Sequence, residues 1–167
     1  GFTEYCVTCA YIHDIGKMFI SQNILQKNGK LTDEEFEIMK THTTLGYQLC
    51  LKDKALRPYY AGPYYHHEAL DGTGYPQGLL KKDIPYEAQI IRVADEFDAI
   101  VSKRQYKSHI NISDALKIII ENTQPSPNAP QGTGFTNAGK NNKLVVKKLI
   151  SVVLDDTEYE IACTMNY

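Results

Sequence analysis

Side chains that can bind metal ions gather in four short stretches of this chain. Four of the five histidines and three aspartates make up these stretches, which are His13-Asp14, His42, His66-His67 and Asp95 with Asp98. Imidazole and carboxylate groups without a thiolate favour Fe or Mn, with Zn or Ni as alternatives, over the all-oxygen sites of Mg or Ca. A carboxylate has two oxygens and can bridge two ions, whereas an imidazole serves one. We therefore expect a centre of divalent ions in which Asp14 is a bridging ligand.

Two such ions could carry out the whole hydrolysis of a phosphodiester. They would lower the pKa of a bridging water to about 7, orient the resulting hydroxide and neutralise charge on the phosphoryl oxygens. Adjacent residues at a helix end point about 100° apart, so the pairs His13-Asp14 and His66-His67 can each face two neighbouring ions. A histidine taken alone is more often a core or surface residue than a ligand, so this hypothesis depends on the clustering.

Helices with apolar periodicity are expected to carry these side chains. The first helix is expected to end at the His13-Asp14 pair. The second begins with a capping box of Thr32 and Glu35 and carries His42. The expected helices span residues 4–13, 32–51, 55–68, 86–102, 113–122 and 142–154.

The third expected helix delivers His66-His67 at its end, and Gly62-Pro63 should bend or interrupt it. The segment 71–76 that follows is dense in turn formers, which predicts an ordered loop or a tight bend. Only residues 158–164 indicate a strand, and the alternating patterns of a parallel sheet are missing. A chain of 167 residues accommodates one sizeable core, so we predict a single all-α domain.

Composition and charge exclude several classes of protein. With 43% apolar and 23% charged residues, the chain is expected to be globular rather than disordered. A formal charge of -2 provides no basic field for long nucleic acid, although local cations can hold a small anion. No apolar run approaches the roughly 20 residues that cross a bilayer, and the N-terminus lacks the pattern of a signal peptide. We expect a soluble chain without membrane contact, and Gly1 in place of methionine suggests a piece of a longer polypeptide.

Cysteines indicate the redox compartment. The four cysteines are too sparse and irregular for a disulfide framework, since they stand at Cys6, Cys9, Cys50 and Cys163. We therefore expect a reducing compartment, the cytoplasm. The pair Cys6-x-x-Cys9 has a spacing that can bind zinc or act in redox chemistry, but no second pair accompanies it. Burial of two small apolar side chains is the preferred interpretation.

Residues 12–107 resemble the HD-GYP domains, a family of bacterial metal-dependent phosphohydrolases. The resemblance rests on four motifs, which are His13-Asp14-Ile15-Gly16-Lys17, Thr41-His42, His66-His67-Glu68-x-x-Asp71-Gly72-x-Gly74-Tyr75-Pro76-x-Gly78-Leu79 and Ala94-Asp95-x-x-Asp98-Ala99. It implies an all-helical HD fold over residues 1–167, with the core motifs in 12–107 and variable helices in 108–167. It also implies hydrolysis of cyclic di-GMP, to the linear dinucleotide or to GMP, at a centre of two or three metal ions in bacterial second-messenger signalling.

The resemblance also implies roles for individual residues. Asp14 and Lys17 are expected to be catalytic, and Lys17 is similar to the lysine that meets the scissile phosphate in the family. The implied metal ligands are His13, Asp14, His42, His66, His67 and Asp95.

Several of the implied roles leave an alternative open. Arg104 and Lys107 resemble further phosphate contacts, but charged side chains are also common at an exposed helix end. Tyr75 could stack on a guanine or act only structurally. Glu68 could orient a ligand histidine or be solvated. The residues expected to shape the loop through their backbone angles are Gly72, Gly74 and Pro76.

The chain departs from the family pattern at its N-terminus. HD-GYP domains normally carry another histidine, and sometimes a glutamate, on a helix well upstream of the His-Asp pair, and only twelve residues precede His13 here. The N-terminal helix of the family is therefore expected to be missing. One metal ion would then lack a protein ligand, so we expect metal to be held weakly.

Two other functions remain open beside cyclic di-GMP hydrolysis. One is a degenerate module that binds a nucleotide, or docks a diguanylate cyclase partner through the Gly-Tyr-Pro loop, without hydrolysis. The other keeps the HD chemistry and acts on a different nucleotide. Whether the chain forms a homodimer is open as well.

Overall fold

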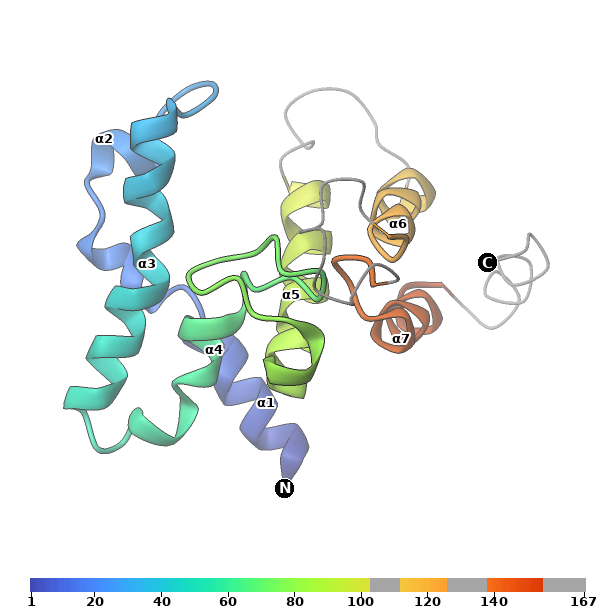
Figure 1. The fold of residues 1–167 in the computed structure, drawn as a ribbon, viewed down its shortest axis with the longest axis horizontal. Helices are drawn as coiled ribbons and strands as arrows, with labels where there is room; N and C mark the ends of the chain where they lie inside the picture. The colour runs from blue at the N-terminus through green and yellow to red at the C-terminus, as the bar shows by residue number, and fades with distance from the viewer. Residues whose placement is uncertain (103–111, 126–137, 155–167) are drawn as a thin grey trace.

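The computed structural model describes residues 1–102, 112–125 and 138–154, and this part of the chain is helical (Figure 1). Its one pairing of the β type is an isolated bridge between Asp71 and Leu80. The all-α prediction is therefore confirmed. The α-helices are α1 (Phe2–Tyr11), α2 (Gln22–Leu25), α3 (Asp33–Lys52), α4 (Ala61–Tyr65), α5 (Tyr86–Ser102), α6 (Ile112–Glu121) and α7 (Lys143–Val153). The short 3-10 helices are η1 (Ile15–Phe19), η2 (Arg57–Tyr59) and η3 (Lys81–Asp83).

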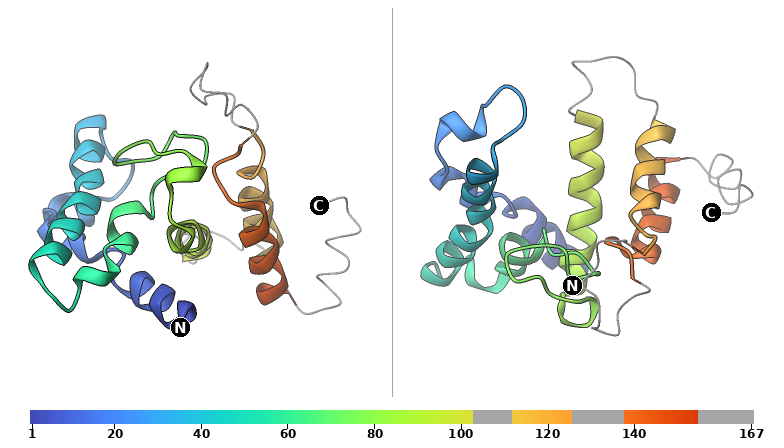
Figure 2. Two further views of the ribbon diagram at one scale, coloured as in Figure 1. Left: turned by 60° about the horizontal axis from the view of Figure 1, so that its bottom comes forward. Right: turned by 45° about the horizontal axis from the view of Figure 1, so that its top comes forward.

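Helix α5 stands in the middle of the described structure. It contacts α1 and α4, and it also contacts α6 and α7. Figures 1 and 2 show α3 and α4 on one side of α5 and the pair α6 and α7 on the other. The turn η1 packs along α3, which in turn contacts α4. The segments that carry the expected site residues thus surround one region between α3 and α5.

The start of α3 follows from its sequence. Thr32 Oγ1 accepts a hydrogen bond from the Glu35 amide at 3.2 Å, and the Glu35 carboxylate accepts one from the Thr32 amide at 2.8 Å. This capping box satisfies amides that helix geometry leaves without partners. Acidic residues fill the first turn and Lys52 lies in the last, which suits the helix dipole. The expected helices 32–51 and 86–102 are confirmed as α3 and α5.

Two of the expected helices need correction. Helix α1 ends before the His13-Asp14 pair, which lies in the turn that follows it. The expected helix 55–68 is interrupted, as predicted, but the break falls at Tyr60, ahead of Gly62-Pro63, and divides it into η2 and the short α4. Pro58 and Pro63 lack the amide hydrogen that a continuous helix needs. Gly62, inside α4, packs so closely on α1 that a Cβ would come 2.1 Å from a backbone oxygen of that helix.

Apolar side chains make two buried clusters. The larger cluster joins α5, α6 and α7, and its buried members are Val93, Leu116, Ile119, Val145, Val146 and Ile150. The smaller cluster contains Leu70, Ile84 and Ala88. The expected helices 113–122 and 142–154 are confirmed as α6 and α7 apart from their terminal residues. The strand expected at 158–164 lies outside the described residues.

Among the described helices, none combines the length and the apolar character that a membrane crossing requires.

The loop of residues 71–76 is ordered, as expected, and a buried carboxylate holds it. Glu68 is 1% exposed, and its two carboxylate oxygens accept hydrogen bonds from the amides of Gln77 at 2.7 Å and Leu79 at 2.8 Å. These oxygens contact the loop rather than solvent or a histidine ring, so neither role expected for Glu68 describes it. Its carboxylate fastens the loop to the segment that carries His66-His67.

Two glycines shape the same loop, as expected. Gly72 has a φ of 81°, a backbone conformation that other residues rarely adopt. Gly74 lies directly on the preceding segment, where a Cβ would come 2.3 Å from Ala69 N and 2.4 Å from His67 O. The loop can pack against the histidine segment at this distance only because Gly74 has no side chain.

Replacing Glu68 with glutamine should destabilise the fold and loosen the loop. The amide oxygen can keep one of the two backbone hydrogen bonds, but the NH2 group then faces the other backbone amide, donor against donor. We expect the free energy of unfolding to fall by roughly 1–3 kcal/mol. We also expect faster hydrogen exchange at Gln77 and Leu79. Urea unfolding and hydrogen–deuterium exchange measure the two effects.

Glu121→Gln is the matched control, because Glu121 is exposed at the end of α6. Its free energy of unfolding should stay within about 0.5 kcal/mol of the parent protein. Equal stability of the two variants would contradict the role given to Glu68.

Candidate metal centre

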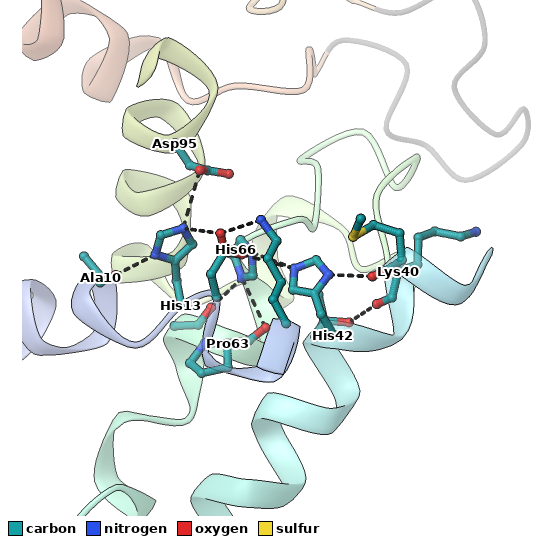
Figure 3. Close-up of polar contacts among 12 residues, drawn as sticks. Ala10, His13, Lys40, His42, Pro63, His66 and Asp95 are labelled. Carbon is teal, nitrogen blue, oxygen red and sulfur yellow. Dashed lines mark hydrogen bonds and ion pairs between the residues drawn. The ribbon is translucent and has the colours of Figure 1, made fainter. Parts of the chain in front are cut away.

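The six side chains expected to bind metal ions lie close together. Figure 3 shows His13, His42, His66 and Asp95 of this set in the region between α3 and α5. The six come from the turn after α1, from α3, from the segment after α4 and from α5. They make two groups, and within each group the ligand atoms lie within 4.8 Å of one another: Asp14, His42, His66 and His67, and His13, His66 and Asp95. Asp98 is exposed and belongs to neither group.

Small residues let these segments approach one another. A Cβ on Gly16, just after His13-Asp14, would come 1.8 Å from His42 O. A Cβ on Gly46, one turn beyond His42, would come 2.8 Å from Pro63 Cβ. The close contact of η1, α3 and α4 therefore brings histidines from three separate stretches of the sequence within reach of one another.

Backbone carbonyl groups determine which ring nitrogen is protonated in three of the four histidines. In each of the three, Nδ1 forms a hydrogen bond with a backbone carbonyl oxygen of the preceding turn. The pairs are His13 with Ala10 O at 2.6 Å, His42 with Met39 O at 2.6 Å and His66 with Gly62 O at 2.8 Å. A carbonyl oxygen only accepts, so Nδ1 carries the proton of each neutral ring. Each Nε2 then directs its lone pair into the cluster, as in histidines that bind metal ions.

The unprotonated nitrogens of His42 and His66 face each other. Their Nε2 atoms are 3.3 Å apart, and Asp14 Oδ1 lies 3.4 Å from the first and 3.6 Å from the second. No hydrogen bond can join these atoms while each presents a lone pair, and Asp14 Oδ1 is buried without a hydrogen-bonding partner. Four ligands arranged as a tetrahedron about 2.0–2.1 Å from an ion are about 3.4 Å apart. These donors therefore fit a divalent cation placed among them.

The other oxygen of Asp14 faces the second group. His13 Nε2 is also buried without a hydrogen-bonding partner, and it lies 3.4 Å from Asp14 Oδ2 and 3.4 Å from Asp95 Oδ1. Asp14 thus directs one oxygen toward each group, as a bridging carboxylate does. Lys17 Nζ lies 2.6 Å from Asp14 Oδ2, so an ammonium group borders the second group.

Protonation states in the cluster suit metal binding. Burial opposes the ionisation of Asp14, but the Lys17 ammonium beside its carboxylate favours it, and the pKa of Asp14 lies far below its ordinary value. Burial lowers the pKa of His66 and His67, and the positive charges near them add to this effect. The carboxylate is therefore ionised and these two imidazoles are neutral, the states in which both groups bind metal ions.

His13 and Asp95 behave as a coupled pair at the edge of the cluster. Burial alone would lower the pKa of His13, but the nearby carboxylates of Asp95 and Asp14 and the hydrogen bond to Ala10 O raise it. Burial alone would raise the pKa of Asp95, but the contact with His13 lowers it. Each partner thus stabilises the charge of the other.

The remaining expected site residues have different outcomes. Tyr75 stacks on His67, with ring centroids 4.7 Å apart and planes inclined by 21°, so it covers one face of that imidazole. Arg104 and Lys107 lie outside the described residues.

Arg92 is a site residue that the sequence reasoning missed. Its Nη1 donates to His67 O at 3.4 Å, and its Nε donates to Asn141 Oδ1 at 3.1 Å. Its position in the sequence could have indicated this role, because Arg92 is three positions before Asp95 and therefore lies on the same face of the helix as that expected ligand.

A family model described as HD domain matches residues 5–125. A cyclic di-GMP phosphodiesterase of Thermotoga maritima is 44% identical over 125 residues, which are 71% of this chain and 34% of that protein. The cyclic di-GMP phosphodiesterase response regulator RpfG of Xanthomonas campestris is 44% identical over 110 residues, which are 64% of this chain and 29% of that protein. The 3'3'-cGAMP-specific phosphodiesterase 3 of Vibrio cholerae is 39% identical over 113 residues, which are 68% of this chain and 25% of that protein.

The chain spans about a third or less of the length of these curated relatives. The matched region contains the complete histidine and aspartate cluster and the Gly-Tyr-Pro loop. From these matches and from the motifs that form the cluster, it follows that the chain belongs to the HD domain family, in its HD-GYP branch.

Proposed function

We propose that this chain is a metal-dependent phosphodiesterase that hydrolyses a cyclic dinucleotide, with cyclic di-GMP as the first candidate substrate. The observation that carries the proposal is the convergence of His42 Nε2, His66 Nε2 and Asp14 Oδ1, which lie 3.3 to 3.6 Å apart with no proton to share. Relatives that are named cyclic di-GMP phosphodiesterases and are 44% identical to this chain support the choice of substrate.

Two divalent ions are proposed, Fe or Mn in preference to Zn or Ni, because the donors are imidazoles and carboxylates without a thiolate. The proposed ligands are His42, His66 and His67 for one ion and His13 and Asp95 for the other. Asp14 is proposed for both, because its Oδ1 lies beside His42 and His66 and its Oδ2 beside His13. When bound, such ions lower the pKa of a coordinated water to about 7 and neutralise charge on the phosphate.

Lys17 is the proposed catalytic cation. Its side chain is 40% exposed while its Nζ contacts Asp14, so the ammonium can turn from the carboxylate toward an anionic substrate without a change in the backbone. Tyr75 is proposed to border the substrate base beside His67. Arg104 and Lys107 are proposed as further phosphate contacts, on the pattern of the family.

The proposal extends to assembly and location. Residues 1–167 are proposed to form one domain, because α6 and α7 share a buried cluster with α5. All six proposed ligands come from one chain, so the site does not require a homodimer.

The exposed positions of the loop, Thr73, Pro76 and Gln77, are where a diguanylate cyclase partner would dock. A cytoplasmic location is proposed, because the proposed substrate is a bacterial second messenger.

Asp14→Asn should abolish hydrolysis, because one oxygen of the bridging carboxylate becomes an NH2 group that cannot bind a cation. We expect turnover of cyclic di-GMP with Mn²⁺ or Fe²⁺ to fall by roughly 100-fold or more. Chromatography of the linear dinucleotide and GMP measures turnover, and elemental analysis measures bound metal. Asp114→Asn, at an exposed aspartate of α6, is the control and should retain full activity.

The same assay separates the rival functions. A degenerate binding module would bind cyclic di-GMP equally well with and without a chelator and release no product. Relatives specific for 3'3'-cGAMP make that dinucleotide the second candidate substrate. Turnover of 3'3'-cGAMP, or of a nucleoside phosphate, in preference to cyclic di-GMP would replace the proposed substrate and leave the metal chemistry in place.

Lys17→Met should impair catalysis without emptying the metal site. Loss of one cation next to the scissile phosphate is expected to lower kcat/KM roughly 100-fold, while metal content stays that of the parent protein. Lys27→Met is the matched control, because the ammonium of Lys27 pairs with Glu35 away from the cluster. Loss of metal in Lys17→Met, or unchanged kcat/KM, would refute a role for Lys17 at the phosphate.

A further inference from the structure

His67 is held differently from the other three histidines of the cluster. In those, a backbone carbonyl fixes Nδ1, whereas neither ring nitrogen of His67 has a hydrogen-bonding partner among residues 1–102, 112–125 and 138–154. Its ring instead stacks on Tyr75, with ring centroids 4.7 Å apart, and lies tilted against His66, with centroids 4.1 Å apart. Stacking leaves a ring free to slide in its plane, so the position of His67 must come from its main chain.

The main chain of His67 is fixed through its carbonyl oxygen. Two donors meet there, the Tyr75 amide at 3.1 Å and Arg92 Nη1 at 3.4 Å. The first donor belongs to the Gly-Tyr-Pro loop and the second to α5. Because the second bond is long, its contribution depends on the charge of the guanidinium and on how firmly that group is held.

A residue from the C-terminal part of the chain, Asn141, fixes the side chain of Arg92 through a hydrogen bond. Its Nε donates to Asn141 Oδ1 at 3.1 Å, and Asn141 is 2% exposed. The Asn141 side chain in turn donates to the Glu96 carboxylate at 2.7 Å, and the other Glu96 oxygen accepts from the Asn122 side chain. The Asn141 amide also donates to Asn122 O at 2.9 Å. A continuous polar network thus runs from His67 to the residues that end α6 and precede α7.

Only an arginine can make both contacts in this network. The planar guanidinium directs Nε toward Asn141 and Nη1 toward His67 at fixed angles, whereas a lysine has one terminal nitrogen. The carboxylate of Glu96, reached through Asn141, lies close enough to compensate the partly buried charge. The geometry therefore couples the junction before α7 to one histidine of the cluster.

We propose that Arg92, held by Asn141, is a positioning residue that sets His67 for metal binding, so that the segment before α7 is part of the metal centre. The inference rests on the proposed function in one respect, that the cluster binds metal ions. It goes beyond that function, because neither Arg92 nor Asn141 belongs to the two groups of side chains that could hold an ion.

The test is a Co²⁺ titration of the full chain, followed by the visible absorption of bound Co²⁺, which reports ligand geometry. Asn141→Ala should weaken Co²⁺ binding about 10- to 100-fold, the usual effect of losing a group that orients a ligand, and should change the absorption spectrum. Arg92→Lys keeps the charge but not the two directed donors, so it should behave like Asn141→Ala.

Asn142→Ala is the matched control for a purely structural effect. It removes the side-chain cap on the Leu144 amide at 2.9 Å and the bond to Gln89 at 2.8 Å, and it leaves Arg92 untouched. Urea unfolding should show a similar loss of stability in the two alanine variants, while Asn142→Ala keeps the parent affinity and spectrum. Equal weakening of Co²⁺ binding in both variants, or no weakening in Asn141→Ala, would overturn the proposal.

A double-mutant cycle tests the route through His67. If Asn141 acts by way of that histidine, Asn141→Ala should have no further effect on Co²⁺ affinity in a His67→Ala background. Additive losses would show that Asn141 acts elsewhere and would overturn the proposal. Failure to take up Co²⁺ in the parent protein would refute the metal centre itself, whereas Co²⁺ binding without turnover of any cyclic dinucleotide would refute only the proposed activity.

Discussion

The mutual repulsion of lone pairs is the constraint on which the centre of this molecule depends. His42 Nε2, His66 Nε2 and Asp14 Oδ1 are pressed to within 3.3 to 3.6 Å, and backbone carbonyls keep the ring protons on the far side of both imidazoles. Such an arrangement is unfavourable in a buried site unless a positive charge lies among the donors. The rest of the fold can be understood as the scaffold that enforces this convergence.

Close backbone contacts, rather than large apolar side chains, hold the donor atoms of the cluster near one another. Gly16 and Gly46 allow η1, α3 and α4 to approach at distances that any side chain would prevent. The main apolar cluster lies elsewhere, between α5, α6 and α7. Burial of that cluster supplies stability at a distance from the site, which leaves the site free to gather polar groups that would be costly in an ordinary core.

Two charged side chains, the buried Glu68 and the partly buried Arg92, connect the cluster to its surroundings, and each does so through the main chain. Glu68 accepts hydrogen bonds from two loop amides, and Arg92 donates to the carbonyl of His67. Neither side chain contacts another charged group directly within the salt-bridge distance among the described residues. Hydrogen bonds to backbone groups satisfy a buried charge and fix the position of a segment at the same time.

Sequence by itself determined the residue types of the centre and the helices whose signals are local. The capping box at Thr32 placed the start of α3, and apolar periodicity placed α5, because both signals involve residues within a few positions of one another. The motifs also indicated the HD-GYP family, and with it the six side chains that converge. The Gly62-Pro63 pair indicated an interruption in the segment 55–68, but only the tertiary structure decided where the break falls and where α1 ends, since the close packing of Gly62 on α1 leaves no periodic signal. The tertiary structure also decided that Asn141 supports Arg92 across 49 positions of sequence, because such a contact depends on how helices pack and not on any local preference.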